Sequence, residues 1–275
     1  MKKLKFKWIN LILVIIILIC IIMFSKSLYE IIIWEKESNE MEEQIKEIHQ
    51  MVEIEEVIEN EESDVEVTIQ EEITESSPYW DYINMNLINV DFSELQNINS
   101  DTKGWIQVNG TNINYPFVQT KDNKYYLKHS YDKSYNTGGW IFLDYRNNIN
   151  SLDKNTIIYG HGRKDKTMFG SLKNILKSGW LNDTNNYIVK LSTETKNTLW
   201  QVFSVYHIPT TSDYIKVKFK DNNEFLKWTD MLIKRSAYDF KTKINENDNV
   251  LTLSTCYNKD EKVVLHAKLI KKETR

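Results

Sequence analysis

A lone cysteine near the end of the chain is the residue best suited to covalent chemistry. Of the two cysteines, Cys20 lies in an apolar run near the N-terminus and Cys256 ends the strand-like run VLTLSTC. If the apolar run spans a membrane, Cys256 has no intramolecular disulfide partner. A solitary exported cysteine is either a small core residue or a working thiol. Because strand ends are where side chains leave the core, the position of Cys256 favours a nucleophile.

A thiol nucleophile needs a neighbouring group that takes its proton and later protonates the departing amine, and histidine does both near neutral pH. His161 is the best placed histidine, because it follows TIIY and lies between two glycines that permit a tight turn. The other four lie in an acidic segment, a polar turn and two predicted strands: His49, His129, His207 and His266. Of these, His129 remains an alternative. We therefore expect Cys256 and His161 to form a catalytic pair.

Residues 1–34 predict a membrane anchor. Four lysines precede an uncharged apolar run over residues 8–25, which is close to the shortest helix that crosses about 30 Å of hydrocarbon. The lysines predict a cytoplasmic N-terminus, with the rest of a single-pass protein outside the cell membrane. A cleaved signal peptide is the alternative, but no small-residue cleavage site follows the run.

Residues 35–78 predict an acidic stalk. Residues 35–76 contain seventeen Asp or Glu and two Lys, a net charge of -15. Ile45, Ile48 and Val52 belong to a weak helical stripe, so a frayed helix or short coiled coil is the alternative to an extended, self-repelling chain. We expect this segment only to set the distance between the membrane and the folded domain.

Residues 79–275 predict the folded domain, with a mainly β fold. Eight short runs are rich in β-branched and aromatic residues and are bounded by turn formers, which favours a barrel or sandwich. The runs cover residues 105–119, 139–146, 155–161, 186–192, 198–208, 214–219, 249–256 and 262–272. Helical patterns cover residues 80–98, 168–179 and 222–240. A net charge of +7 without long basic runs argues against nucleic-acid binding, and no Cys/His cluster has the spacing of metal ligands.

Several separated motifs resemble the sortase family, and specifically its class B. They are GWIQVNGTNINYPFVQTKDNKYYLKHSYD, GGWIFLDYRNN, NTIIYGHGRKDKTMFGSLKN and LTLSTC, in the family's order between about residues 104 and 270. The resemblance implies a closed β-barrel of about eight strands. It also implies an N-terminal helical extension and a late helix before the strand that carries Cys256.

The same resemblance implies a membrane-bound cysteine transpeptidase on a Gram-positive surface. Such enzymes cleave secreted proteins after the Thr of a C-terminal x-Pro-x-Thr-x sorting signal. Cys256 would form a thioester with the Thr, and His161 would act as acid and then base. The acyl group would pass to an amine of a cell-wall peptide or of its lipid-linked precursor. No metal or organic cofactor is implied.

The chain departs from the family at one catalytic position. Aligning VVLHAKLI with the family's strand puts Lys262 where an Arg helps to hold the oxyanion. Lysine keeps the positive charge but loses the planar, bidentate fork. Three interpretations stay open: Lys262 does this work, Arg146 or Arg163 substitutes for it, or the protein is a weakened or inactive relative.

Six further residues resemble the substrate groove of class B members. They are Asn123, Leu127, Thr210, Tyr214, Ile215 and Ser254. Each also has a structural interpretation, and Leu127 and Ile215 fit a core position equally well.

Two other classes of function remain as alternatives. An exported cysteine peptidase would release its product to water; a papain-like layout is disfavoured because His161 precedes Cys256 by 95 residues. The second alternative is an anchored binding or scaffold protein that kept the barrel without the activity. Lys262, at the family's Arg position, is the residue that supports this alternative.

Overall fold

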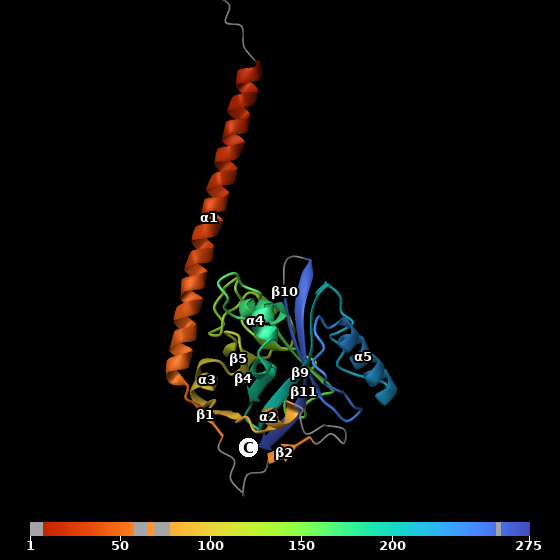
Figure 1. The fold of residues 1–275 in the computed structure, drawn as a ribbon. Coiled ribbons are helices and arrows are strands. Elements are labelled where there is room, and N and C mark those ends of the chain that lie inside the picture. The colour runs from red at the N-terminus through yellow and green to blue at the C-terminus, as the bar shows by residue number, and fades with distance from the viewer. Residues whose placement is uncertain (1–7, 58–64, 69–77, 257–259) are drawn as a thin grey trace, which may run out of the picture.

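The computed structural model describes residues 8–57, 65–68, 78–256 and 260–275, and for Ile9 and Cys256 it describes the backbone alone (Figure 1). Three predicted features lie outside the described residues. These are the lysines within residues 1–7, the stalk over residues 58–64 and 69–77, and the turn at residues 257–259 that follows the predicted nucleophile.

Eight strands form a closed barrel, as predicted. Along the sheet they run in the order β10-β7-β6-β5-β4-β8-β9-β11, and β10 also pairs with β11, which closes the circle. The short β2 extends the sheet beside the far end of β11, and β1 pairs with β3 separately. The strands are β1 Ile54–Glu56, β2 Val65–Val67, β3 Ile88–Val90, β4 Thr102–Val108, β5 Asn114–Val118, β6 Phe142–Leu143, β7 Asn155–Gly160, β8 Ile188–Ser192, β9 Lys196–Pro209, β10 Val250–Cys256 and β11 Glu261–Thr274.

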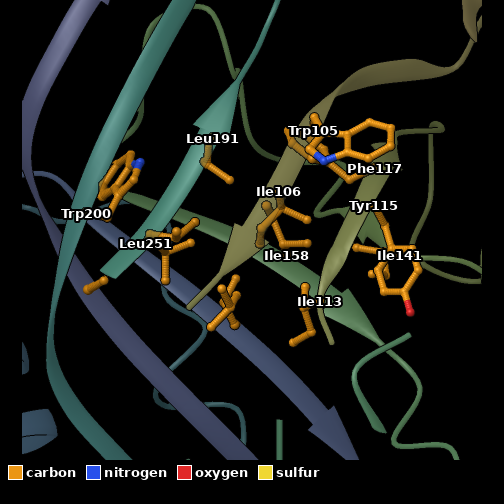
Figure 2. Close-up of a cluster of buried hydrophobic side chains, with 14 of the residues drawn as sticks. Trp105, Ile106, Ile113, Tyr115, Phe117, Ile141, Ile158, Leu191, Trp200 and Leu251 are labelled. Atoms are coloured by element: carbon orange, nitrogen blue, oxygen red, sulfur yellow. The ribbon is translucent and has the colours of Figure 1, made fainter. Parts of the chain in front are cut away.

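Large apolar side chains fill the barrel. Figure 2 shows Trp105, Phe117, Ile158, Trp200 and Leu251 gathered between strands from different parts of the chain. All five are fully buried. Burying one such side chain stabilises a fold by about 1.5–3 kcal/mol, so this cluster holds the strand ends in place.

The late helix is confirmed as α5, Asn222–Arg235. Asp221 caps its start by accepting a hydrogen bond from the Glu224 amide at 2.8 Å, and its last turn is basic, which suits the helix dipole. Phe225, Trp228 and Leu232 bury one face of α5 in a second apolar cluster with residues of β9, β10 and β11.

The remaining helices are short. They are α2 Tyr79–Ile83, α3 Ser93–Ile98, α4 Ser178–Leu181 and the 3-10 helices η1 Tyr125–Leu127, η2 Gly170–Leu176 and η3 Thr184–Asn186. The predicted helix over residues 80–98 is wrong as one element, because β3 separates α2 from α3. Ile88 and Val90 are buried while Asn89 between them is not, and this alternation favours a strand. The predicted helix at residues 168–179 is a 3-10 segment followed by one α turn.

The strand predicted at residues 214–219 is also wrong. Two of its carbonyl groups accept hydrogen bonds from side chains: the Asn155 amide donates to Lys216 O at 2.9 Å, and Arg146 donates to Ile215 O at 3.0 Å. Phe219 packs on Phe225 of α5, with ring centroids 5.2 Å apart. The segment therefore runs between the barrel and α5 without joining the sheet.

The described part of the expected stalk belongs to the folded structure. Helix α1 is continuous over Trp8–Met51, and its C-terminal half runs beside the barrel (Figure 1). Met41 and Ile48 are buried in the main core, whereas Glu42 and Glu43 are exposed. The weak apolar stripe thus faces the barrel, Glu37 is buried beside it, and Glu42 and Glu43 face solvent, which differs from the extended spacer expected. The three-part division of the chain into anchor, stalk and folded domain stays a prediction.

Candidate active site

Three neighbouring strands bring the predicted reactive residues to one end of the barrel. Strands β7 and β10 pair in parallel with Gly160 opposite Thr255, so His161 and Cys256 are the next residues along each strand. Strands β10 and β11 are antiparallel, with Cys256 opposite Lys262. Because adjacent strands lie about 4.8 Å apart, the Cys256 backbone is held between the other two positions.

A hydrogen bond to a backbone carbonyl orients the ring of His161. Its Nε2 lies 2.9 Å from the Leu127 carbonyl oxygen, which can only accept, so Nε2 carries the hydrogen and Nδ1 of the neutral ring is an acceptor. Burial lowers the pKa of His161, the bond to Leu127 opposes this, and the charges of Arg163 and Lys262 lower the pKa further. The ring is therefore neutral near pH 7, as a general base must be.

A cavity of about 550 Å³ opens beside these residues. This volume is within the range of small-molecule and peptide sites. His161 and Lys262 line the cavity together with all six predicted groove residues: Asn123, Leu127, Thr210, Tyr214, Ile215 and Ser254. The structure thus brings together residues that the sequence spreads over more than one hundred positions. Their roles toward a substrate stay predictions.

Two of the groove residues form a buried hydrogen-bonded pair. Tyr214 Oη and Ser254 Oγ are 2.9 Å apart, and the two residues are 2% and 4% exposed. Leu127 is 39% exposed, so its core interpretation does not hold. Ile215 is half-buried and packs against the α5 cluster, so it serves the core and lines the cavity at once.

A buried carboxylate organises the opposite wall. Asp144 is fully buried and accepts hydrogen bonds from Asn123 Nδ2 at 3.0 Å and from Tyr159 Oη at 2.9 Å. Arg146 donates to it from two nitrogens, at 2.8 and 2.7 Å. Burial alone would raise the pKa of Asp144, but these donors outweigh it and hold the pKa below its usual value. The charged carboxylate therefore fixes Asn123 and Tyr159 at the cavity edge.

The two candidate substitute arginines are engaged elsewhere. Arg146 pairs with Asp144, and Arg163 pairs with Asp165 at 2.7 Å. Among the residues that the structure describes along the cavity, the cation is Lys262. This placement favours Lys262 over either arginine as the group that faces a reacting carbonyl.

The other histidines lie away from the cavity lining that the structure describes. His129 stacks on Tyr125, with ring centroids 3.9 Å apart, and its Nδ1 bonds the Tyr125 carbonyl at 2.7 Å. His266 is fully buried, His207 is exposed on β9, and His49 packs edge-on against a core tryptophan. The placement leaves His161 as the histidine beside Cys256.

Several lining residues were not predicted from the sequence. They are Phe142, Tyr159, Gly160, Thr211, Ser212 and Thr255. Tyr159 had a usable signal, because it lies two residues before His161 on one strand and therefore shares its face. Phe142 had no such signal of alternation, since its strand is only two residues long.

A thiol, an imidazole and an ammonium group at the ends of three adjacent strands form the residue set of a cysteine acyl-transfer enzyme. The family model described as the sortase domain matches residues 106–270. The chain belongs to the sortase family and is a sortase-type cysteine transpeptidase.

Relatives of this chain are class B sortases. Sortase B of Listeria monocytogenes is 37% identical over 185 residues, which cover 65% of this chain and 74% of the relative. A Staphylococcus aureus sortase B–substrate complex superposes with a TM-score of 0.61 at 34% identity, covering 66% of this chain and 84% of that one. A sortase B complexed with triglycine superposes with a TM-score of 0.62 at 33% identity, covering 66% and 85%.

Helix α1 contains one segment that is long and apolar enough to cross a membrane. Over Asn10–Met51 the best window has a mean hydropathy of 2.9, and none of that window is buried against the rest of the chain.

Proposed function

We propose that this sortase is anchored in the cell membrane by residues 8–25 and cleaves secreted proteins at a C-terminal x-Pro-x-Thr-x sorting signal. It then transfers the new Thr carboxyl end to an amine of a cell-wall peptide or of its lipid-linked precursor. The single observation that carries this proposal is the cavity that joins His161, Lys262 and the six groove residues beside the Cys256 backbone.

The reaction proceeds in two acyl transfers. The Cys256 sulfur, having given its proton to His161, attacks the Thr carbonyl carbon and forms a tetrahedral oxyanion. The C–N bond then breaks, His161 returns the proton to the leaving amine, and a thioester remains on Cys256. The incoming amine attacks the thioester, loses a proton to His161, and the sulfur leaves. The thioester keeps the acyl group activated, so an amine can accept it in place of water.

Lys262 is the proposed donor to the oxyanion. It lies directly opposite Cys256 across the β10–β11 pair and lines the cavity. A preorganised cation beside the carbonyl stabilises the charge that develops in both tetrahedral intermediates. A lysine supplies this charge from a compact ammonium group with three rotatable donors, where an arginine offers a planar fork that can donate two parallel hydrogen bonds.

Complexes of relatives support the two kinds of substrate. The Staphylococcus aureus enzyme was captured with a substrate, and a sortase B was captured with triglycine, a short peptide with a free amine. For this chain, the same two classes are the proposed partners: a protein with a sorting signal and a peptide amine.

The proposed location rests on α1. Its apolar window is exposed over its whole length, which is unfavourable in water and favourable in a bilayer. The lysines that precede it favour an N-terminus in the cytoplasm, so that the barrel lies outside the membrane.

The test is a product analysis with the full chain in detergent micelles. A panel of x-Pro-x-Thr-x peptides is incubated with and without triglycine, and products are identified by mass spectrometry. The proposal requires a ligated product ending in Thr-Gly-Gly-Gly that is absent in Cys256→Ala and His161→Ala. Cleavage without ligation at saturating triglycine would identify a peptidase. No product from any peptide would favour an inactive barrel.

A further inference from the structure

The last turns of α1 lie against the two segments that flank His161. Glu37, Ser38, Met41 and Ile48 are spaced along one helical stripe, and all four are buried against the barrel. Figure 1 shows this end of α1 beside the barrel, while the apolar end projects beyond it. Two of these four residues are polar, so the contact is more than an apolar patch.

Glu37 is hydrogen-bonded to the turn over residues 136–139. Its carboxylate accepts hydrogen bonds from the Thr137 amide, at 3.3 Å, and from the Thr137 hydroxyl. Its backbone carbonyl accepts a hydrogen bond from Asn136 Nδ2 at 2.9 Å. Asn136 in turn accepts from the Gly138 amide at 2.8 Å. The helix therefore fixes both the side chains and the backbone of this turn.

Ser38 is hydrogen-bonded to the loop that begins at His161. Its hydroxyl accepts a hydrogen bond from Arg163 at 2.6 Å and donates one to Asp165 at 2.7 Å. The same two side chains pair with each other at 2.7 Å, and Thr167 donates to Asp165 at 2.6 Å. Through Ser38, helix α1 is thus hydrogen-bonded to the Arg163–Asp165 ion pair of the loop.

The ring of His161 lies between the turn over residues 136–139 and the loop that follows His161, both of which are hydrogen-bonded to α1. Gly139 has a positive φ of 60°, and a Cβ placed on it would lie 2.9 Å from His161 Cδ2 and 2.4 Å from the Tyr126 carbonyl oxygen. On the loop side, the His161 carbonyl accepts from the Phe169 amide at 3.0 Å. A displacement of either segment therefore moves the imidazole.

We propose that Glu37 and Ser38 of α1 are positioning residues that hold His161 in its working place beside Cys256, so that the membrane helix is a structural part of the active site. The inference rests on the proposed role of His161 as acid and base. It gives the juxtamembrane segment a function beyond that of a spacer. A shift of about 1 Å in a catalytic group can cost on the order of 100-fold in rate, so loss of this contact should be visible in turnover.

The test uses the full chain in detergent micelles, with Cys20→Ser so that Cys256 is the one thiol present. The disruptive variants are Glu37→Ala and Ser38→Ala. The conservative variants Glu37→Gln and Ser38→Thr keep a hydrogen-bonding group and should recover most of the loss. Glu43→Ala is the matched control, because Glu43 is an exposed acid on the same helix.

The first readout is the alkylation rate of Cys256 by iodoacetamide across pH, which needs no peptide substrate. The pKa of His161 is lowered by burial and by the charges of Arg163 and Lys262. Such a neutral ring can take the thiol proton, and because iodoacetamide reacts with the thiolate, the acid limb of the profile reports how readily Cys256 loses its proton. When either segment is freed, the displaced ring no longer takes that proton and the thiol stays protonated to a higher pH. We expect the acid limb of the alkylation profile to move to higher pH in both disruptive variants and to stay unchanged in Glu43→Ala.

The second readout is ligation of a sorting peptide to triglycine. We expect kcat to fall by roughly 10- to 100-fold in the disruptive variants, with KM changing less than about twofold. Disruptive variants that lower the melting temperature but leave the alkylation profile and kcat as in Glu43→Ala would overturn the proposal. A wild-type chain that ligates no peptide would count against the proposed function alone, since the alkylation profile still decides whether α1 positions His161.

Discussion

Lys262 is the proposed oxyanion donor, and its replacement by methionine tests what the cation does. Methionine keeps the length and most of the apolar stem but removes the charge and its hydrogen bonds. Lys262 is opposite Cys256 in the antiparallel β10–β11 pair and lines the 550 Å³ cavity. Positions directly opposite in such a pair lie about 4.5–5.5 Å apart at Cα, which a four-carbon lysine stem spans.

The expected magnitude follows from the bond that is lost. A hydrogen bond to a charged group is worth about 1.5–3 kcal/mol. At about 1.4 kcal/mol per tenfold, Lys262→Met should lower kcat/KM by roughly 10- to 150-fold. Lys262→Arg restores the charge and adds a second parallel donor, so it should match or exceed the wild type by about 2- to 10-fold.

The assay is steady-state ligation of a sorting peptide to triglycine at pH 7 with saturating amine. Lys227→Met is the control, because Lys227 is exposed on α5 and its loss changes the net charge equally. A kcat/KM for Lys262→Met within twofold of Lys227→Met would refute the assignment of Lys262 to the oxyanion. A slower Lys262→Arg would show that the site is built around the single lysine donor.

Three further predictions concern the frame of the site and its pH dependence. Asp144→Ala should lower the free energy of unfolding by about 3 kcal/mol in a urea titration, because the Tyr159 hydroxyl and the Asn123 amide lose their buried acceptor. Tyr214→Phe should cost about 1 kcal/mol in the same titration, since the buried Ser254 hydroxyl loses its partner. Burial, aided by a nearby arginine, lowers the pKa of His266 to about 3 from 6.5. Between these two pH values the unfolded chain binds a proton that the folded chain does not, so the free energy of unfolding should fall as the pH drops from about 6.5 toward 3. The variant His266→Gln should remove this pH dependence.

The barrel was predictable because most of its strands are short runs rich in β-branched and aromatic residues, bounded by turn formers. The exceptions have local causes. The run at residues 214–219 has the same composition, but the side chains of Asn155 and Arg146 take its carbonyl groups. The opening helix failed because Ile88 and Val90 bury alternate positions of a strand within a helix-like stretch.

The candidate site was predictable where a motif carried it. Cys256, His161 and Lys262 were each marked by a motif or its alignment, and the register of β7, β10 and β11 brings their backbones together. Tyr159 was missed although strand alternation placed it on the same face as His161.

The docking of α1 could not be read from composition. Seventeen acidic residues over residues 35–76 predict a solvated chain, and the apolar stripe within them is weak. What decides the outcome is pairing across long distances in the sequence: Glu37 with Thr137, and Ser38 with Arg163. Such partners are visible only once the barrel has brought the two loops to one side.

Intact-protein mass spectrometry of the full chain mixed with a sorting peptide tests directly whether Cys256 carries the acyl group. We expect a mass increase equal to the acyl part of the peptide up to its Thr, located on Cys256 and absent in Cys256→Ala. Triglycine should remove this adduct as the ligated product appears. Turnover without any adduct on Cys256, or an adduct that triglycine leaves in place, would contradict this role of Cys256.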